Sequence, residues 1–142
     1  GYSTIYGDSV GGYAPIKDVE KTLVWKVANW RNEFARASGQ TPPIPENSIS
    51  KPPSAELRPD QTDQDSLPPY PTLDAIVQSY VEEGLDVDEI VRTGHPRSLV
   101  EKILQTIDRN EYKRRQAPVG IRVTHRSFGK DWRYPITSQF RA

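Results

Sequence analysis

Three short stretches of the sequence combine residue types that can bind an anion. Residues 6–12 (YGDSVGG) are rich in glycine, which lets a backbone approach a ligand closely. Residues 51–60 (KPPSAELRPD) place a cation and a hydroxyl before a loop that can close over a phosphate. Residues 111–115 (EYKRR) contain three consecutive cations, which suit a phosphate or a carboxylate. These stretches are therefore the candidates for chemistry.

Each stretch also has a structural interpretation that requires no ligand. Glycine and aspartate in 6–12 are typical of an ordinary turn. The prolines in 51–60 are typical of a solvated loop, and the cations of 111–115 complement the negative end of a helix dipole. Taken one at a time, each stretch favours the structural interpretation.

Composition narrows the classes of function. The chain has 142 residues with 19 basic and 19 acidic side chains, so its zero net charge argues against nucleic acid and anionic membranes as partners. The absence of cysteine excludes disulfides and thiolate chemistry, and two histidines are too few for a histidine-rich metal centre. No apolar run approaches the roughly 20 residues of a membrane span. We expect a soluble, cytoplasmic protein, and we interpret the start, GYSTIYGDSVGG without methionine, as the middle of a larger one.

The elements that must position these stretches are mainly helices. Apolar residues recur at helical spacing over Val19–Ala37, where Asp18 is the expected N-cap. Helices are also expected over Thr72–Glu83 and Pro96–Arg114. A short helix capped by an aspartate should end at Gly94, and the alternation in Gly120–Phe128 suggests a strand. We expect the long helices to pack through apolar stripes. The first stripe is made of Leu23, Val24, Val27, Ala28, Trp30 and Phe34, and the last of Leu99, Val100, Ile103, Leu104 and Ile107.

Between the first two long helices lies a proline-rich region, residues 41–71. It holds nine of the 13 prolines, and therefore cannot form a long helix or a central strand. Ile44 and Ile49 should anchor its first part. Residues 55–66 should be the most mobile, becoming ordered when a nucleotide binds beneath them.

Three segments together resemble the bacterial glutamine-dependent NAD⁺ synthetases. They are GYSTIYGDSVGGYAPIKDVEKT, IPENSISKPPSAELRPDQTDQDSLPPY and DRNEYKRRQAPVGIRVTHRSFGKDWRYPITSQF. The resemblance implies that residues 1–142 are the C-terminal part of an α/β, Rossmann-like ATP-pyrophosphatase domain (adenine nucleotide alpha hydrolase-like), mostly helical in this segment. It implies an amide ligase that uses ATP to activate deamido-NAD⁺ and ammonia, derived from glutamine by a glutaminase domain, to give NAD⁺. Homo-oligomers formed through synthetase domains are also implied.

The resemblance assigns roles to individual residues. Lys21 and Ser54 match ATP contacts, Lys113 matches a deamido-NAD⁺ contact, and Tyr112 is a weaker candidate beside it. Two loop residues, Arg58 and Asp60, are further candidates over the nucleotide. The ammonia-dependent branch has a lysine and an aspartate where this chain has Ile5 and Gly12, which favours the glutamine-dependent branch.

Other elements of the family lie outside this sequence. The SGGxDS pyrophosphate loop and most Mg²⁺ ligands belong to the family's upstream part, so no catalytic or metal-binding residue is expected here, and this segment alone should be inactive.

Two further functions compete with the ligase. Leu67-Pro68-Pro69-Tyr70-Pro71 could form a polyproline helix that docks on a partner protein. Cations in 113–115 and 122–133 could contact nucleic acid, although the zero net charge argues against this.

Overall fold

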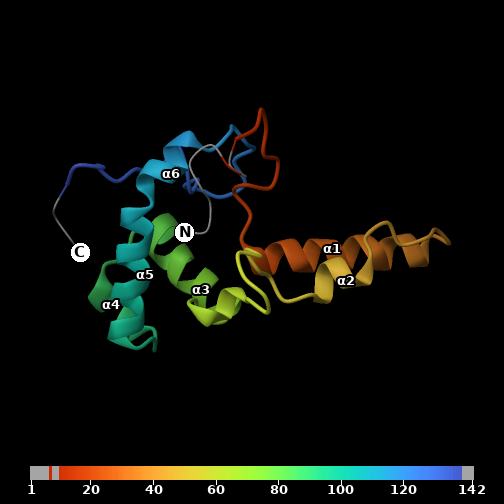
Figure 1. Cartoon of the computed structure of the whole chain (residues 1–142), viewed down its shortest axis with the longest axis horizontal. Helices are drawn as coiled ribbons and strands as arrows, with labels where there is room; N and C mark the ends of the chain where they lie inside the picture. The colour runs from red at the N-terminus through yellow and green to blue at the C-terminus, as the bar shows by residue number, and fades with distance from the viewer. Residues whose placement is uncertain (1–6, 8–9, 139–142) are drawn as a thin grey trace. The chain divides into compact units, whose positions relative to one another are not determined.

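The chain is described by a computed structural model that covers residue 7 and residues 10–138 (Figure 1). Its helices are α1 (Lys21–Ala37), α2 (Glu46–Ser50), η1 (Asp63–Asp65), α3 (Tyr70–Val77), η2 (Gln78–Glu83), α4 (Val87–Arg92), α5 (Arg97–Arg109) and α6 (Glu111–Gln116). Within the described residues the β structure is a single parallel bridge between Tyr13 and Val119. About half of the chain is therefore helical, so the prediction of a mostly helical segment is confirmed in part. Residues 1–19 with 73–142 form one compact unit and residues 20–72 another, and each is considered by itself.

The larger unit has an apolar core built by the later helices. The stripe predicted for α5 is buried: Val100, Ile103, Leu104 and Ile107 all face the core, and Leu99 packs against it. Further core residues come from α3, η2, α4 and the C-terminal segment, namely Ile76, Val81, Val87, Ile90 and Trp132. The prediction of an apolar stripe is thus confirmed for this helix.

Sequence signals for the ends of the short helices are also confirmed. Asp86 caps α4, because its side chain accepts a hydrogen bond from the Glu89 amide at 2.8 Å while the Glu89 carboxylate accepts one from the Asp86 amide at 2.9 Å. Gly84 ends η2 with a φ of 73°, a conformation that glycine adopts without strain. η2 is a π-helix that continues α3, so the predicted Thr72–Glu83 helix ends where expected but begins two residues earlier, at Tyr70.

The helix predicted over Pro96–Arg114 is instead two helices that meet at Asn110. The Asn110 side-chain amide donates to the carbonyl of Thr106 at 2.7 Å, and asparagine disrupts helices by competing in this way for backbone groups. Arg114 donates to the carbonyl of Ile107 at 2.6 Å, a second hydrogen bond to an acceptor that the Asn110 amide also contacts, at 3.2 Å. α6 is therefore a separate helix, which begins at Glu111 directly after Asn110.

Asp18 was expected to cap α1, but the structure gives it another role. The helix begins at Lys21, and Asp18 is buried, accepting hydrogen bonds from the amides of Val123 at 2.8 Å, Thr124 at 2.9 Å and Phe128 at 3.0 Å. The Thr124 hydroxyl donates to the same carboxylate at 2.9 Å. Because these amides bond a carboxylate rather than a neighbouring strand, the strand predicted over 120–128 is wrong, and this segment is a loop folded around Asp18.

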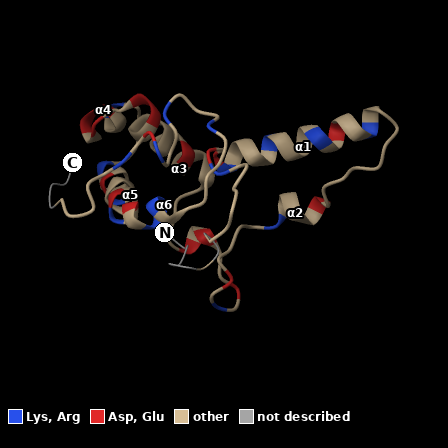
Figure 2. Ribbon diagram, turned by 90° about the horizontal axis from the view of Figure 1, so that it is seen from above, with Lys and Arg blue, Asp and Glu red and all other residues tan. Residues whose placement is uncertain are grey.

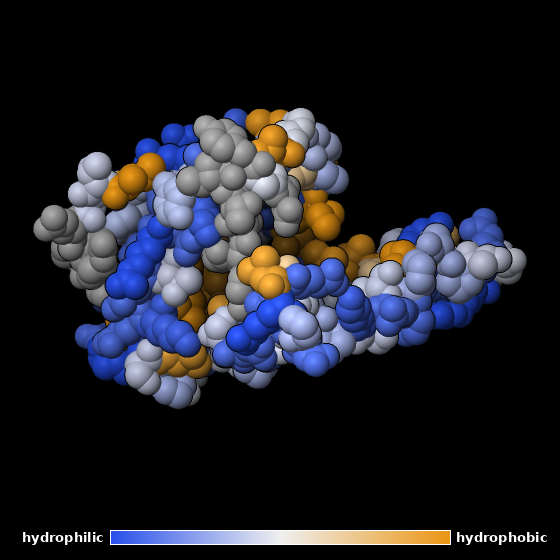
Figure 3. All heavy atoms as spheres, in the orientation of Figure 1, coloured by the Kyte–Doolittle hydropathy of each residue, from blue (hydrophilic) through white to orange (hydrophobic). Residues whose placement is uncertain are grey.

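The apolar side chains of this loop lie at the surface. Ile121 and Val123 are both exposed, as are Val10 and Ile16 in the segment before α1. Figure 3 shows apolar atoms gathered where Figure 1 draws these two segments. The alternation read as a strand therefore contributes little to the core.

In the smaller unit, residues 20–72, the helices pack mainly through polar contacts. The buried Asn32 side chain donates to the Ile44 carbonyl at 2.8 Å and accepts from the Ile44 amide at 3.1 Å. The region is thus held at Ile44 through backbone hydrogen bonds, whereas the sequence predicted an apolar anchor. The predicted packing of the α1 stripe is wrong for this chain. Leu23, Val27, Trp30 and Phe34 are all exposed, because α1 turns its Asn32 and Ala35 face inward.

Asp18→Asn tests whether one carboxylate holds the 121–128 loop. Burial would raise the pKa of Asp18, but the hydrogen bonds from Thr124, Val123 and Phe128 outweigh it and lower the pKa below its usual value. A carboxylate whose pKa is lowered by folding stabilises the folded state. This contribution to the free energy of unfolding is complete above about pH 4, and it is lost as the pH falls through the pKa of Asp18 in the folded state. We expect Asp18→Asn to cost about 1.5–3 kcal/mol in urea unfolding at pH 7, and progressively less towards pH 2.

The matched control is Asp88→Asn, which removes an exposed carboxylate paired with Arg97 in the same unit. It should change the free energy of unfolding very little. An equal loss for the two variants at pH 7 would show that Asp18 has no special role.

Candidate functional site

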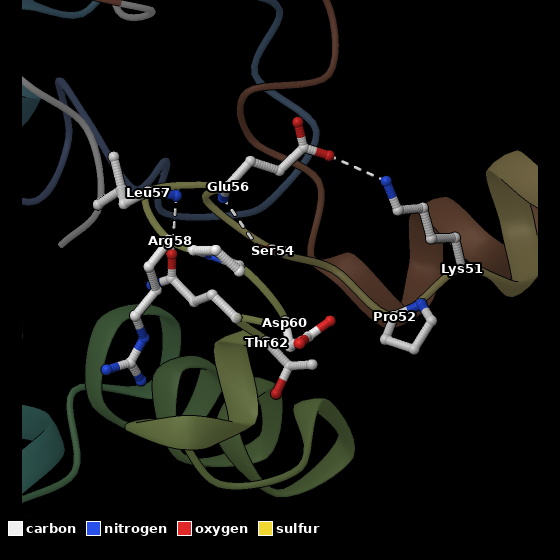
Figure 4. A pocket seen from close by; sticks show the side chains of 10 residues that line it. Lys51, Pro52, Ser54, Glu56, Leu57, Arg58, Asp60 and Thr62 are labelled. Atoms are coloured by element: carbon white, nitrogen blue, oxygen red, sulfur yellow. Dashed lines mark hydrogen bonds and ion pairs between the residues drawn. The ribbon is translucent and has the colours of Figure 1, made fainter.

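A hollow of about 700 Å³ lies in the smaller unit, within the size range of small-molecule sites. It is formed by one stretch of the proline-rich region, and Figure 4 shows its side chains. The lining residues are Lys51, Pro52, Ser54, Glu56, Leu57, Arg58, Pro59, Asp60, Gln61 and Thr62. Three residues singled out from the sequence, Ser54, Arg58 and Asp60, are therefore brought to one hollow.

The near wall of this hollow is held by local polar contacts. The Ser54 hydroxyl oxygen accepts a hydrogen bond from the Glu56 amide at 3.0 Å, which leaves its own hydrogen to be donated to another acceptor. Lys51 forms an ion pair with Glu56 at 2.9 Å, and the hydrogen bond and charge of Lys51 lower the pKa of that carboxyl. These contacts leave the Ser54 hydroxyl able to donate a hydrogen bond. They also favour the ionised form of the Glu56 carboxyl.

The far side of the loop is closed by a second ion pair. Arg58 contacts Asp65 at 2.9 Å, and Asp65 also accepts from the Thr62 hydroxyl at 3.0 Å and completes the capping box that starts η1. Hydrogen bonds from Arg58 and Thr62 lower the pKa of Asp65. Asp60 sits between them with a φ of 56°, a strained conformation for a non-glycine residue.

The loop was expected to be mobile without a ligand, and here its own contacts give it a defined shape. Arg58 forms an ion pair with Asp65, so a phosphate bound in the hollow would have to compete with the Asp65 carboxylate for the Arg58 guanidinium. The predicted mobility of residues 55–66, and their closure over a nucleotide, stay predictions.

Lys21, the other predicted phosphate contact, is the first residue of α1. The first turn contains no acidic residue, and the side chain of Glu20 at the N-cap makes no capping hydrogen bond. A lysine at the positive end of a helix dipole is unfavourable by itself, whereas an anion there gains from both the dipole and the charge. The Lys21 ammonium lies 5.8 Å from the centre of the Trp25 ring, which keeps it near the start of the helix.

A chain of contacts connects α1 to the loop within the same unit. Trp25 meets the Tyr70 ring edge-on with centroids 5.6 Å apart, and the Tyr70 hydroxyl donates a short hydrogen bond to Asp63. The Asp63 amide in turn donates to the carbonyl of Pro53 at 2.9 Å, one residue before Ser54. Asp63 is only 7% exposed and its other carboxylate oxygen, Oδ1, has no hydrogen-bond partner. The start of α1 and the Ser54 loop are thus connected by one series of contacts that runs through Trp25, Tyr70, Asp63 and Pro53, which we call the polar relay.

Sequence reasoning missed this relay. The Thr62–Asp65 capping box is a readable pattern for η1. The pairing of Asp63 with Tyr70 has no such signal, because it depends on how the loop folds. Tyr70 and Pro71 are also the first residues of α3, and a helix excludes the polyproline conformation that the interaction-module interpretation requires.

The second group of predicted residues lies in the larger unit, on α6. Of its three cations, Arg114 and Arg115 contact the buried Glu111 carboxylate at 2.6 and 3.2 Å, so these two hold the fold. Lys113 lies 6.0 Å from the centre of the Tyr112 ring, and the exposed Tyr112 borders a hollow of about 90 Å³. Two of the three cations therefore serve the fold, and the binding role of Lys113, with Tyr112 beside it, stays a prediction.

Ile5 lies outside the described residues, and Gly12 is exposed, with nothing near enough to touch a side chain there. Over residue 7 and residues 10–138, no three carboxylate or imidazole groups gather as metal ligands. No helix within the described residues is long and apolar enough to cross a membrane.

Comparison with known proteins gives a consistent result. Residues 1–117 match the family model of NAD synthase. The chain is 57% identical to the glutamine-dependent NAD(+) synthetase of Aquifex aeolicus over 140 residues and 51% identical to that of Thermotoga maritima over 141 residues. These matches cover 99% of this chain and 24% of each relative, so the chain spans about a quarter of the length of the curated relatives it matches.

A solved structure is also similar to the chain. It is the glutamine-dependent NAD+ synthetase from Acinetobacter baumannii in complex with adenosine diphosphate, at 44% identity and a TM-score of 0.49. The match covers 95% of this chain and 22% of that one.

Tyr70→Phe tests the polar relay directly. The variant keeps the ring contact with Trp25 but leaves the buried Asp63 carboxylate without its hydroxyl donor, a loss of about 1–3 kcal/mol. We expect amide hydrogen exchange in residues 53–65 to become roughly 5- to 150-fold faster. The control Tyr112→Phe removes a hydroxyl elsewhere and should leave these amides unchanged. Unchanged exchange in Tyr70→Phe would mean that the loop is held by other contacts.

Proposed function

Because the chain belongs to the NAD synthase family, we propose that it is the C-terminal portion of the ligase domain of a glutamine-dependent NAD⁺ synthetase. The support for this proposal is the match of residues 1–117 to the family model and of 99% of the chain to glutamine-dependent relatives. The whole domain is then an α/β, Rossmann-like ATP-pyrophosphatase domain, and this segment supplies helices and the proline-rich region 41–71.

The reaction forms one amide in two steps. A carboxylate oxygen of deamido-NAD⁺ attacks the α-phosphorus of ATP, and pyrophosphate leaves. Ammonia then attacks the carbonyl carbon of the acyl-adenylate, the bond to AMP breaks, and a proton is released as the amide of NAD⁺ forms. The ammonia comes from glutamine, through a glutaminase domain that is not in this sequence.

ATP is assigned to the smaller unit. The observation that carries the assignment is the position of Lys21 as the first residue of α1, directly after Glu20, whose side chain makes no capping hydrogen bond. Such an arrangement stabilises phosphate charge, which grows as pyrophosphate leaves. Ser54 adds a hydroxyl donor, and Arg58 exchanges Asp65 for phosphate while Asp60 shapes the loop.

Deamido-NAD⁺ is assigned to α6 in the larger unit. Lys113 supplies a charge for the anionic dinucleotide, and the exposed Tyr112 ring offers a face on which a planar base can stack. Arg114 and Arg115 act indirectly, since their pairing with Glu111 fixes the helix that carries Lys113.

Magnesium has no fitting site among the described residues. Over residue 7 and residues 10–138 the carboxylates do not gather into a ligand set, and several are engaged in ion pairs or capping. The ion is therefore assigned to the rest of the enzyme, and no step is drawn through it here. Homo-oligomers formed by synthetase domains complete the proposal.

Kinetics of the complete enzyme with free ammonia separate the two lysine roles. Lys21→Ala should mainly lower kcat, because its contact strengthens in the transition state, whereas Lys113→Ala should mainly raise KM for deamido-NAD⁺. Each effect should be roughly ten- to a hundredfold, the size of a lost charge-assisted contact. Using ammonia removes the glutaminase from the measurement.

Two variants serve as matched controls, because each removes a cation from the same unit away from the site. Arg36→Ala acts at the other end of α1, and Lys102→Ala acts on exposed α5 surface. Both should stay within about twofold of wild type, as surface changes usually do. If Lys21→Ala and Lys113→Ala do the same, the assigned roles are wrong.

A further inference from the structure

A separate hollow, of about 150 Å³, lies in the larger unit, and we call it the Lys17 hollow. It is formed by residues 17–18 and 119–131, which lie outside the helices, and Figure 2 shows basic residues on such irregular segments as well as on helices. Its volume is below the roughly 300 Å³ at which sites for drug-sized ligands begin, but it has room for a small ion. Its lining includes three cations, Lys17, Arg122 and Lys130, and two carboxylates, Asp18 and Asp131.

Lys17 is held in the wall of this hollow. Its ammonium nitrogen, Nζ, donates a hydrogen bond to the carbonyl of Pro118 at 2.6 Å. Its side chain also passes close to Gly129, where an added Cβ would lie 3.2 Å from the Lys17 Cε and 3.5 Å from Nζ. A side chain at Gly129 would therefore press on the end of the lysine. The half-buried ammonium group is thus kept at one position in the hollow.

Both carboxylates of the Lys17 hollow are engaged by other groups. Asp18 accepts its hydrogen bonds from the 123–128 loop, and Asp131 pairs with Arg122 at 3.4 Å. Among the described residues, neither Lys17 nor Lys130 forms an ion pair. The hollow therefore has two ammonium groups that no carboxylate of the described chain contacts.

These two ammonium groups repel each other. Partial burial lowers the pKa of Lys17, and the positive charge of Lys130 lowers it further, by more than the negative charge of Asp18 raises it. Protonated Lys17 thus lies where positive charge outweighs negative charge. An anion between the two lysines would reverse this balance, because it attracts both ammonium groups at once.

We propose that the Lys17 hollow binds a phosphate group, which bridges the ammonium groups of Lys17 and Lys130 and accepts a hydrogen bond from the Ser127 hydroxyl. A dianion matches two positive charges, and its several acceptor oxygens match three separate donors. The bound group would join residues 119–131 to the segment before α1. The inference rests on these contacts and charges, and not on the ligase activity.

Acetylation of lysines in the complete protein, followed by mass spectrometry of its peptides, tests the site. Inorganic phosphate at about four times its dissociation constant should slow the labelling of Lys17 and Lys130 about fivefold, because the dianion covers both amines. Lys102, exposed on α5, is the reference lysine and should be labelled at an unchanged rate. Sodium chloride at the same ionic strength controls for screening and should not protect Lys17.

Lys130→Gln tests the bridge. Protection of Lys17 should then require roughly tenfold more phosphate, because one charge-assisted contact is lost. Without phosphate, Lys17 should be labelled more slowly in this variant than in wild type, because its pKa rises when the neighbouring charge is removed. Lys102→Gln removes a cation from the same unit and is the matched control, for which both measurements should stay unchanged.

Glycerol 3-phosphate distinguishes the two sources of a phosphate group. Protection by both compounds would assign the site to the phosphate of a larger molecule, whereas protection by inorganic phosphate alone would assign it to the free ion, and both results support the proposal. Three results would overturn it. Lys17 labelling that phosphate leaves unchanged would mean that the hollow binds no anion. Equal slowing of Lys17 and Lys102 would show a general ionic effect only. Undiminished protection in Lys130→Gln would place the anion elsewhere.

Discussion

The smaller unit is built under one constraint: α1 turns its apolar stripe outward, so polar contacts must hold residues 20–72 together. Every residue of this segment is described, and Ala35 is its only fully buried apolar side chain. Asn32 bonds both backbone groups of Ile44, and Tyr70 bonds the buried Asp63. Buried polar contacts are costly when broken, so they fix one loop geometry despite the small core. The loop, the hollow and the free face of α1 all follow from this arrangement.

The cations of the chain have two kinds of surroundings. Arg114 and Arg115 both pair with the single buried carboxylate of Glu111, and Arg114 also stacks on Phe128 and Trp132, so these two cations stabilise the fold. Lys21 is instead the first residue of α1, directly after Glu20, at the end of the helix where the dipole favours an anion over a cation. The proposal that this helix end binds phosphate rests on that position.

Regular helices and their caps could be predicted from the sequence, because periodicity and local cap chemistry decide them. The α5 stripe and the Asp86 cap are of this kind. Hydrogen bonds between residues far apart in the sequence could not be predicted. Asp18 has the residue type and position of a helix cap, but it bonds amides more than 100 residues away. For the site, the candidates Ser54, Arg58 and Asp60 could be found in one stretch, whereas the Asp63–Tyr70 bond that holds it requires the folded loop.

The central claim is that α1 and the Ser54 loop form one ATP-binding piece joined through Trp25, Tyr70 and Asp63. Isothermal titration of ATP into the complete enzyme carrying Tyr70→Phe tests it most directly, since Tyr70 supports the loop from beneath rather than lining the hollow. The account predicts ATP binding roughly five- to tenfold weaker, the size of a 1–1.4 kcal/mol coupling, with deamido-NAD⁺ affinity unchanged. ATP affinity within twofold of wild type would contradict it.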